Sequence, residues 1–96
     1  MTVPALMIHS DDSVATAVRP LESGECITVS AGGRETTVTL LQAVPFGHKF
    51  ALRDIPAGEN VTKYGETIGR ATAFIRTGEH THIHNLEGLR GRGDRR

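Results

Sequence analysis

The sequence has little cysteine and few aromatic residues. It holds one cysteine, Cys26, so no internal disulfide can form, which fits a reducing cytoplasm. Cys26 lies in an apolar run, and a free cysteine in such a run usually packs as a small buried hydrophobe. Tryptophan is absent, and the only aromatic residues are Phe46, Phe50, Tyr64 and Phe74. We therefore expect a core built from valine, isoleucine, leucine and alanine.

Charge and hydropathy exclude further classes. The formal net charge is zero, and basic residues are not interleaved with aromatic ones, so nucleic acid is not an expected partner. No stretch approaches the ~20 apolar residues of a membrane span, and no basic segment precedes an apolar one at the N-terminus. Phosphate-binding glycine loops, Gly-x-Ser-x-Gly elbows and CxxC pairs are also missing. We expect a cytoplasmic protein without membrane contact.

The length of 96 residues predicts one domain with a modest core and little room for an enclosed active site. A partner chain is therefore expected. The domain is predicted over residues 1–88. Residues 89–96 form a basic tail rich in arginine, which we expect to be disordered, as chain ends often are. The alternative for the tail is a basic patch that binds an anion or a partner.

Most of the chain consists of short β-like runs separated by glycine turns. One helix is predicted, because Ser10–Ser13 is rich in N-cap residues, Val14, Ala15, Ala17 and Val18 follow at helical spacing, and Pro20 ends the run. The remaining runs are rich in Ile, Val and Thr and cover residues 5–9, 25–30, 35–41, 48–55, 60–63, 67–69, 71–75 and 80–84. This pattern of short runs and glycine turns predicts a mostly β domain, a compact barrel or clip, with one short N-terminal helix.

A turn motif occurs three times in the chain. An apolar residue is followed by two others, then Gly-Glu, then a strand, at Gly24-Glu25, Gly58-Glu59 and Gly78-Glu79. Glycine suits a tight turn because it adopts backbone conformations that other residues resist. The spacing is irregular, so the repetition indicates one turn used repeatedly in a small β fold and not a solenoid.

Five histidines make imidazole the most distinctive side chain. If residues 80–84 form a strand, His80, His82 and His84 share one face, about 7 Å between successive positions. Such a set can converge on one metal ion, and imidazole is the commonest ligand for transition metals. The alternative is an exposed strand whose polar side happens to be histidine.

Three other segments carry polar groups of interest. His48 and Lys49 follow a Pro-Phe-Gly turn at the start of a strand, where His48 is either an acid or base or a satisfied core residue. His9 lies beside Asp11 and Asp12, of which one aspartate is read as the helix N-cap. The third segment, residues 63–66, is predicted to be a turn with a polar rim.

These segments together resemble one family. The runs are His9–Ala15, Val44–Ile55, Val61–Gly69 and Gly78–Asn85, and in that order they are similar to the N-terminal domain of altronate and galactarate dehydratases. The resemblance implies an SAF-like β-clip fold over nearly the whole chain. It also implies a large catalytic domain, fused or on a separate chain.

The resemblance implies lyase chemistry on a small hydroxy acid. In that chemistry a proton next to a carboxylate is removed and a β substituent leaves, as water or as sulfite. We expect the small subunit of a two-chain, metal-dependent dehydratase acting on a sugar acid such as altronate, active only with its large catalytic subunit. The alternatives are the small subunit of sulfolactate sulfo-lyase, a non-catalytic module that binds carbohydrate or a partner, and a free-standing metal carrier.

The resemblance also places the site residues. His48 and Lys49 are assigned to catalysis, His9 and Asp12 to substrate binding, and His82 and His84 to metal. The sequence leaves open whether the histidines contact metal, substrate or the partner chain. The implied cofactor is a divalent metal, iron or manganese, with the partner subunit as an alternative main holder. A homo-oligomer of the isolated chain is a further expectation.

Overall fold

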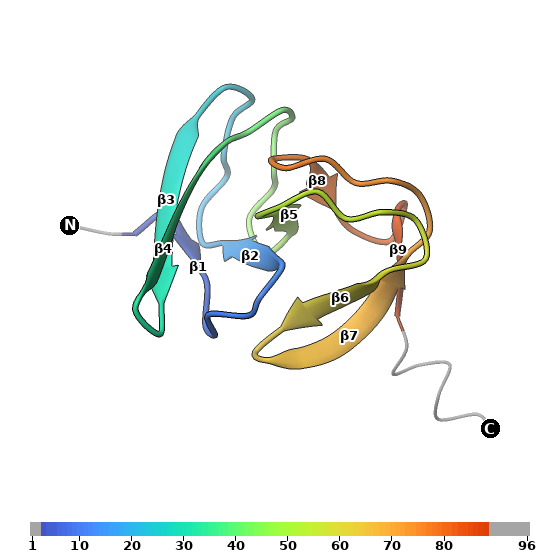
Figure 1. Cartoon of the computed structure of the whole chain (residues 1–96). Helices are drawn as coiled ribbons and strands as arrows, with labels where there is room; N and C mark the ends of the chain where they lie inside the picture. The colour runs from blue at the N-terminus through green and yellow to red at the C-terminus, as the bar shows by residue number, and fades with distance from the viewer. Residues whose placement is uncertain (1–2, 89–96) are drawn as a thin grey trace.

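The computed structural model describes residues 3–88, which form nine strands and no helix. All pairings are antiparallel, and the strands make three small sheets (Figure 1). The four-stranded sheet has the order β1-β2-β5-β8, β3 pairs with β4, and the third sheet has the order β6-β7-β9. The strands are β1 (Ala5–Leu6), β2 (Val14–Ala17), β3 (Cys26–Ala31), β4 (Arg34–Thr39), β5 (Lys49–Ala51), β6 (Asn60–Lys63), β7 (Glu66–Ala71), β8 (His80–Thr81) and β9 (Leu86–Gly88).

Two apolar cores lie on opposite sides of the central strands β2 and β5. In Figure 1 the β3–β4 hairpin lies on one side of these strands and the β6–β7 hairpin on the other. The cross-strand pair Ala15–Phe50 faces the first core, and the neighbouring pair Val14–Ala51 faces the second. Successive residues of a strand point to opposite faces, so a strand between two cores must be apolar on both. The mostly β fold predicted from the sequence is confirmed.

The predicted N-terminal helix is wrong, because Val14–Ala17 is strand β2. Val14 and Ala15 are both fully buried, one in each core. Apolar residues on both faces of a short strand produce the same spacing as one face of a helix, so the pattern alone did not distinguish them. Among the residues described, no helix is long and apolar enough to cross a membrane.

The expected burial of Cys26 is also wrong. Strand β3 alternates, with Ile27 and Val29 buried and Cys26 exposed on the outward face. A strand covered on one side buries only every second residue. The arginine-rich tail predicted over 89–96 lies outside the described residues.

The glycine turn occurs four times in the structure. Gly24, Gly47, Gly58 and Gly78 have φ values of 91°, 83°, 88° and 87°. The apolar residues that precede the turns pair through reciprocal backbone hydrogen bonds, Leu21 with Val44 and Ile55 with Ile75. The sequence motif missed the copy at Gly47 because the next residue is His48, where the other three copies have glutamate. A shared turn therefore presents His48 at the start of β5.

Candidate functional site

Four of the five histidines form an imidazole cluster, which we define as His48, His80, His82 and His84. The His48 Nδ1 and His80 Nε2 atoms are 2.9 Å apart and share a hydrogen bond. The His48 ring stacks on His82 with centroids 3.8 Å apart, and the His80 and His84 centroids are 5.1 Å apart. His48 precedes β5, His80 lies in β8, and the other two lie in the turn before β9. Two segments distant in sequence thus meet at one edge of the central sheet.

The gathering of His80, His82 and His84 was predicted, but the predicted alternating strand is wrong. Strand β8 ends at Thr81, and a turn follows in which the backbone N–H of Asn85 donates to the carbonyl of His82. Thr81 is fully buried whereas Ile83 is 84% exposed, so these two residues do not share a face. The turn folds His82 back over His48, which an extended strand would not allow.

Asn85 fixes the backbone of the imidazole cluster. Its side chain is 4% exposed, its Oδ1 accepts the N–H of His82 at 2.9 Å, and its Nδ2 donates to the carbonyl of His80 at 2.9 Å. The N–H of His80 donates to Gln42 Oε1 at 2.9 Å. Both residues were missed as positioning residues, because a single amide side chain in a sequence does not reveal which backbone groups it will bind.

Two members of the cluster, His80 and His82, favour the neutral imidazole. Burial lowers the pKa of His80, and the neighbouring His84, His48 and His82 lower it further. The pKa of His82 is lowered by burial and then by His48, Lys49 and His84. Each proton added would face other cationic or protonatable groups. A neutral imidazole can accept a proton, which is what a general base at neutral pH requires.

A groove of about 500 Å³ adjoins the cluster. It is lined by Lys49 of β5, by Lys63, Tyr64, Glu66 and Ile68 of the β6–β7 hairpin, and by His82, Ile83, Leu86 and Gly88 of the last turn and strand. Lys49 is half-buried, and burial followed by the charge of Lys63 lowers its pKa. The predicted catalytic residue Lys49 therefore lines the same groove as His82, together with Lys63 and Tyr64.

His9 and Asp12 lie against the back of the Lys63-Tyr64 turn. Asp12 is 1% exposed, and its carboxylate accepts the N–H groups of Ile8, His9 and Gly65 at 3.1, 3.0 and 2.9 Å. Burial raises the pKa of Asp12, but these backbone hydrogen bonds, with one from Tyr64, outweigh it and hold the pKa below its ordinary value. A carboxylate so enclosed positions two turns. Substrate binding by Asp12 stays a prediction.

The His9 ring packs on Gly65, where an added Cβ would lie 2.9 Å from His9 Cδ2. The His9 Nδ1 atom accepts the backbone N–H of Asp11 at 3.1 Å. Within residues 3–88 the stacked rings are those of the imidazole cluster, and His9 is not among them. The structure thus brings His48, Lys49, His82 and His84 together and leaves His9 behind the turn, so substrate binding by His9 also stays a prediction.

The described residues do not form a complete metal site. No group of three or more His, Cys, Asp or Glu in residues 3–88 is arranged to hold an ion. Stacking explains this: the rings of His48 and His82 lie 10° from parallel, so their in-plane nitrogen lone pairs do not converge. One nitrogen each of His48 and His80 is also occupied by their mutual hydrogen bond.

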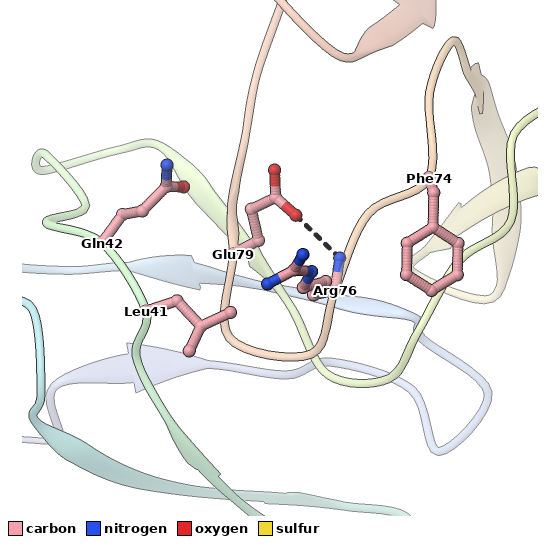
Figure 2. A pocket seen from close by; sticks show the side chains of 5 residues that line it. All are labelled: Leu41, Gln42, Phe74, Arg76 and Glu79. Carbon is pink, nitrogen blue, oxygen red and sulfur yellow. Dashed lines mark hydrogen bonds between the residues drawn. The ribbon is translucent and has the colours of Figure 1, made fainter.

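A second hollow, of about 480 Å³, lies at Leu41, Gln42, Phe74, Arg76 and Glu79. Figure 2 shows that Glu79 turns back onto its own segment, where its Oε1 accepts the backbone N–H of Arg76 at 2.8 Å. Gln42 is likewise engaged, with the N–H of His80. Leu41 and Phe74 are about half exposed. This hollow holds no lysine or histidine, and none of the site residues predicted from the sequence lines it.

Comparison with known proteins identifies relatives of two kinds. The altronate dehydratase of Escherichia coli is 49% identical over 80 residues, which are 83% of this chain but 15% of that protein. The (2R)-sulfolactate sulfo-lyase subunit alpha of Chromohalobacter salexigens is 37% identical over 90 residues, 91% of this chain and 96% of that subunit. The galactarate dehydratase (L-threo-forming) of Escherichia coli is 38% identical over 74 residues, 76% of this chain and 13% of that enzyme.

This chain therefore spans only a small part of the dehydratases but nearly the full length of the sulfo-lyase subunit. Residues 3–89 also match the family described as altronate/galactarate dehydratase SAF domain. The family resemblance predicted from the four sequence runs is confirmed. The chain belongs to the altronate/galactarate dehydratase SAF domain family.

Proposed function

We propose that this chain is the small subunit of a two-chain lyase that acts on a sugar acid or a related hydroxy acid. Family membership supports the reaction class, because the relatives are named dehydratases and a sulfo-lyase. The need for a large catalytic partner is supported by the small share of the dehydratases that this chain spans. It is also supported by the site itself, which is an open edge and not an enclosed cavity.

The observation that carries the proposal is the His48–His80 hydrogen bond beside the groove. A proton on one nitrogen of a neutral imidazole leaves the other nitrogen as an acceptor. The bond at Nδ1 thereby orients His48 with Nε2 available, and in residues 3–88 no hydrogen bond occupies that atom. We assign His48 Nε2 to proton transfer at the substrate carbon or leaving group. Lys49, next to it, is assigned to charge stabilisation on the reacting acid.

The metal ion of the proposed lyase is assigned mainly to the partner subunit. The imidazole cluster does not fit a complete site for iron or manganese, so we assign the ion mainly to the large subunit. His82 and His84 remain predicted ligands of such a shared ion. Equilibrium dialysis of the isolated chain against iron, zinc and manganese should show no stoichiometric retention. Stoichiometric retention by the chain alone would instead support a free-standing metal carrier.

The test of the function is reconstitution with a large dehydratase-like chain. The pair should eliminate water from altronate or galactarate, and His48→Ala should lower kcat by about 100-fold or more with assembly unchanged. Asn60→Ala is the control, because Asn60 is exposed on β6 and does not line the groove. Turnover that survives His48→Ala, with loss confined to assembly, would show that the domain is a binding module without catalytic residues.

A second candidate is the alpha subunit of a sulfolactate sulfo-lyase. The observation that favours it is the 96% coverage of the Chromohalobacter salexigens subunit. It shares the same proton removal next to a carboxylate and differs in the group that leaves. Assaying the reconstituted pair against altronate, galactarate and sulfolactate, with detection of the keto acid and of sulfite, distinguishes the two candidates.

A further inference from the structure

The groove gathers the chain's only two lysines. Lys49 and Lys63 come from different strands, yet both line the same groove. They are close enough that the charge of Lys63 lowers the pKa of Lys49. Folding has therefore placed two like charges together at a cost, since like charges repel most when they are partly desolvated.

Three of the five arginines in residues 3–88 differ from the lysines in their pairing. Arg19, Arg53 and Arg70 lie 3.3, 2.9 and 3.3 Å from the carboxylates of Glu25, Glu59 and Glu87. Within residues 3–88, neither lysine has a carboxylate oxygen within 4.0 Å. Among the described residues, both basic groups at the groove therefore lack the carboxylate partner that Arg19, Arg53 and Arg70 have, and unlike Arg34 and Arg76, which also lack one, they line a single groove together.

Backbone strain holds an aromatic ring at the same place. Tyr64 has φ 59° and Gly65 has φ 74°, which gives a two-residue hairpin turn with both central φ values positive. Such turns favour Asn-Gly, and a bulky residue in the first position is an outlier. Tyr64 is 56% exposed, so burial does not offset the strain. The Lys63 Nζ atom lies 4.5 Å from the ring centroid, which fixes that ammonium over the groove wall.

Glu66 is the acidic residue that lines the groove. It is the cross-strand neighbour of Lys63 but makes no ion pair with it in the described structure. The charge of Glu66 opposes binding of an anion. Removal of that charge should therefore have the opposite effect on anion binding to removal of a lysine charge. The apolar side chains of Ile68 and Leu86, partly buried, complete the groove.

We propose that the groove binds the oxyanion end of the acid substrate through Lys49 and Lys63, with Tyr64 as the residue that positions Lys63. The shared ligand chemistry is a small hydroxy acid carrying a carboxylate or a sulfonate. This inference rests on the proposed function for the identity of the acid. It adds Lys63 and Tyr64 to the site and places the anion beside His48, which stacks on His82.

The experiment uses the only tyrosine as the probe. The chain has no tryptophan, so its intrinsic fluorescence comes from Tyr64, beside the proposed anion. The full chain is titrated at constant ionic strength with galactarate, with sulfolactate and with galactitol, the uncharged analogue. The acids should give a saturable change and galactitol none. The tighter binder of the two acids shows which class of hydroxy acid the groove prefers.

Three variants test the assignment. Lys63→Met keeps the length of the side chain and should weaken acid binding about tenfold, the value of one lost charge-assisted contact. Glu66→Gln should strengthen binding. Arg19→Met removes an equal charge in the other half of the molecule and should leave acid binding unchanged. Absence of saturable binding, or equal weakening by Lys63→Met and Arg19→Met, would overturn the proposal.

The proposed function can survive that result. If the reconstituted pair turns over and depends on His48 while Lys63→Met leaves KM and binding unchanged, only the anion groove fails. If the acids bind but no large chain yields turnover, the groove stands as a binding site and the lyase assignment fails.

Discussion

Two polar regions lie on either side of the Lys63-Tyr64 turn, and they differ in how their groups are satisfied. Behind the turn is a buried junction, where Asp12 and Ser13 bind the β6–β7 hairpin. The N–H of Ser13 donates to the carbonyl of Thr62 at 2.9 Å, and the N–H of Thr62 donates to Ser13 Oγ at 2.8 Å. In front of the turn is the groove, where two lysines have no carboxylate partner among residues 3–88.

This difference distinguishes polar groups that stabilise the fold from charged groups that are available to a ligand. A buried polar group that is fully hydrogen-bonded stabilises one conformation, whereas removal of its partner leaves costly unsatisfied groups. Charges that stay unpaired in a partly desolvated groove destabilise the fold and are available to a ligand. We therefore expect changes in the junction to reduce stability and changes in the groove to reduce binding.

The largest expected effect on stability is at the junction. Asp12→Ala leaves the N–H groups of Ile8, His9 and Gly65 without their acceptor, so the free energy of unfolding should fall by about 3 kcal/mol. Urea unfolding followed by circular dichroism measures the change. The matched control is Asp11→Ala, whose side chain is 80% exposed and should matter by less than about 0.5 kcal/mol. Equal effects of the two changes would refute a structural role for Asp12.

The next effect is at Asn85, which binds the backbone of the imidazole cluster beside the groove. Asn85→Ala removes the acceptor of the His82 N–H and the donor to the His80 carbonyl, at a cost of about 2 kcal/mol. The same change should disorder the stacking of His82 on His48, visible as shifted imidazole nitrogen resonances. Asn60→Ala, at an exposed position of β6, is the control. Unchanged imidazole resonances in Asn85→Ala would show that Asn85 does not position the cluster.

Tyr64→Asn should separate stability from binding. Asparagine suits the positive φ at this position, so the free energy of unfolding should rise by about 1 kcal/mol. Acid binding should weaken at the same time, because Lys63 loses the ring over which it lies. Binding is followed by amide chemical shifts of the groove, since this variant lacks the tyrosine signal. Tyr64→Phe, which keeps both strain and ring, should alter neither quantity. A Tyr64→Asn protein that binds as well as the parent would remove Tyr64 from the site.

The smallest effect is the dependence of stability on pH. His80 and His82 have folded pKa values below the ordinary value, mainly because of burial. The unfolded chain then binds more protons, so this contribution to stability is complete above about pH 6.5 and declines as pH falls below it. Urea midpoints across that range should decrease on acidification, and His80→Gln should flatten the decrease. A parent profile that stays level through the range would contradict the lowered pKa values of His80 and His82.

Much of the fold followed from local pattern. Glycine turns and β-branched runs located most strands, because these signals depend on a few adjacent residues. Strand β2 was misread since Val14 and Ala15 are buried in different cores, which is a tertiary fact. The fourth turn was missed because His48 replaces glutamate there.

The site was predicted in part. The motifs identified His48, Lys49, His82 and His84, which the structure brings to one edge. Asn85, Lys63 and Tyr64 lie far from His48 in sequence, and Gln42 lies far from His80, whose N–H it accepts. The pairing of β5 with β8 and the closure of the β6–β7 hairpin assemble them. A turn with a polar rim was expected at residues 63–66, but neither its strain nor its approach to Lys49 is visible in a sequence.

The most direct test of the groove is the ionisation of its two lysines. Reductive methylation with ¹³C-formaldehyde gives one dimethyl resonance for each lysine, and this chain has only Lys49 and Lys63. Their pKa values are measured with and without galactarate, at constant ionic strength, with galactitol as the neutral control. A bound oxyanion favours the charged form, so galactarate should raise both pKa values and reverse the depression that burial and Lys63 impose on Lys49. Lysine pKa values that galactarate leaves unchanged would contradict an anion site in this groove.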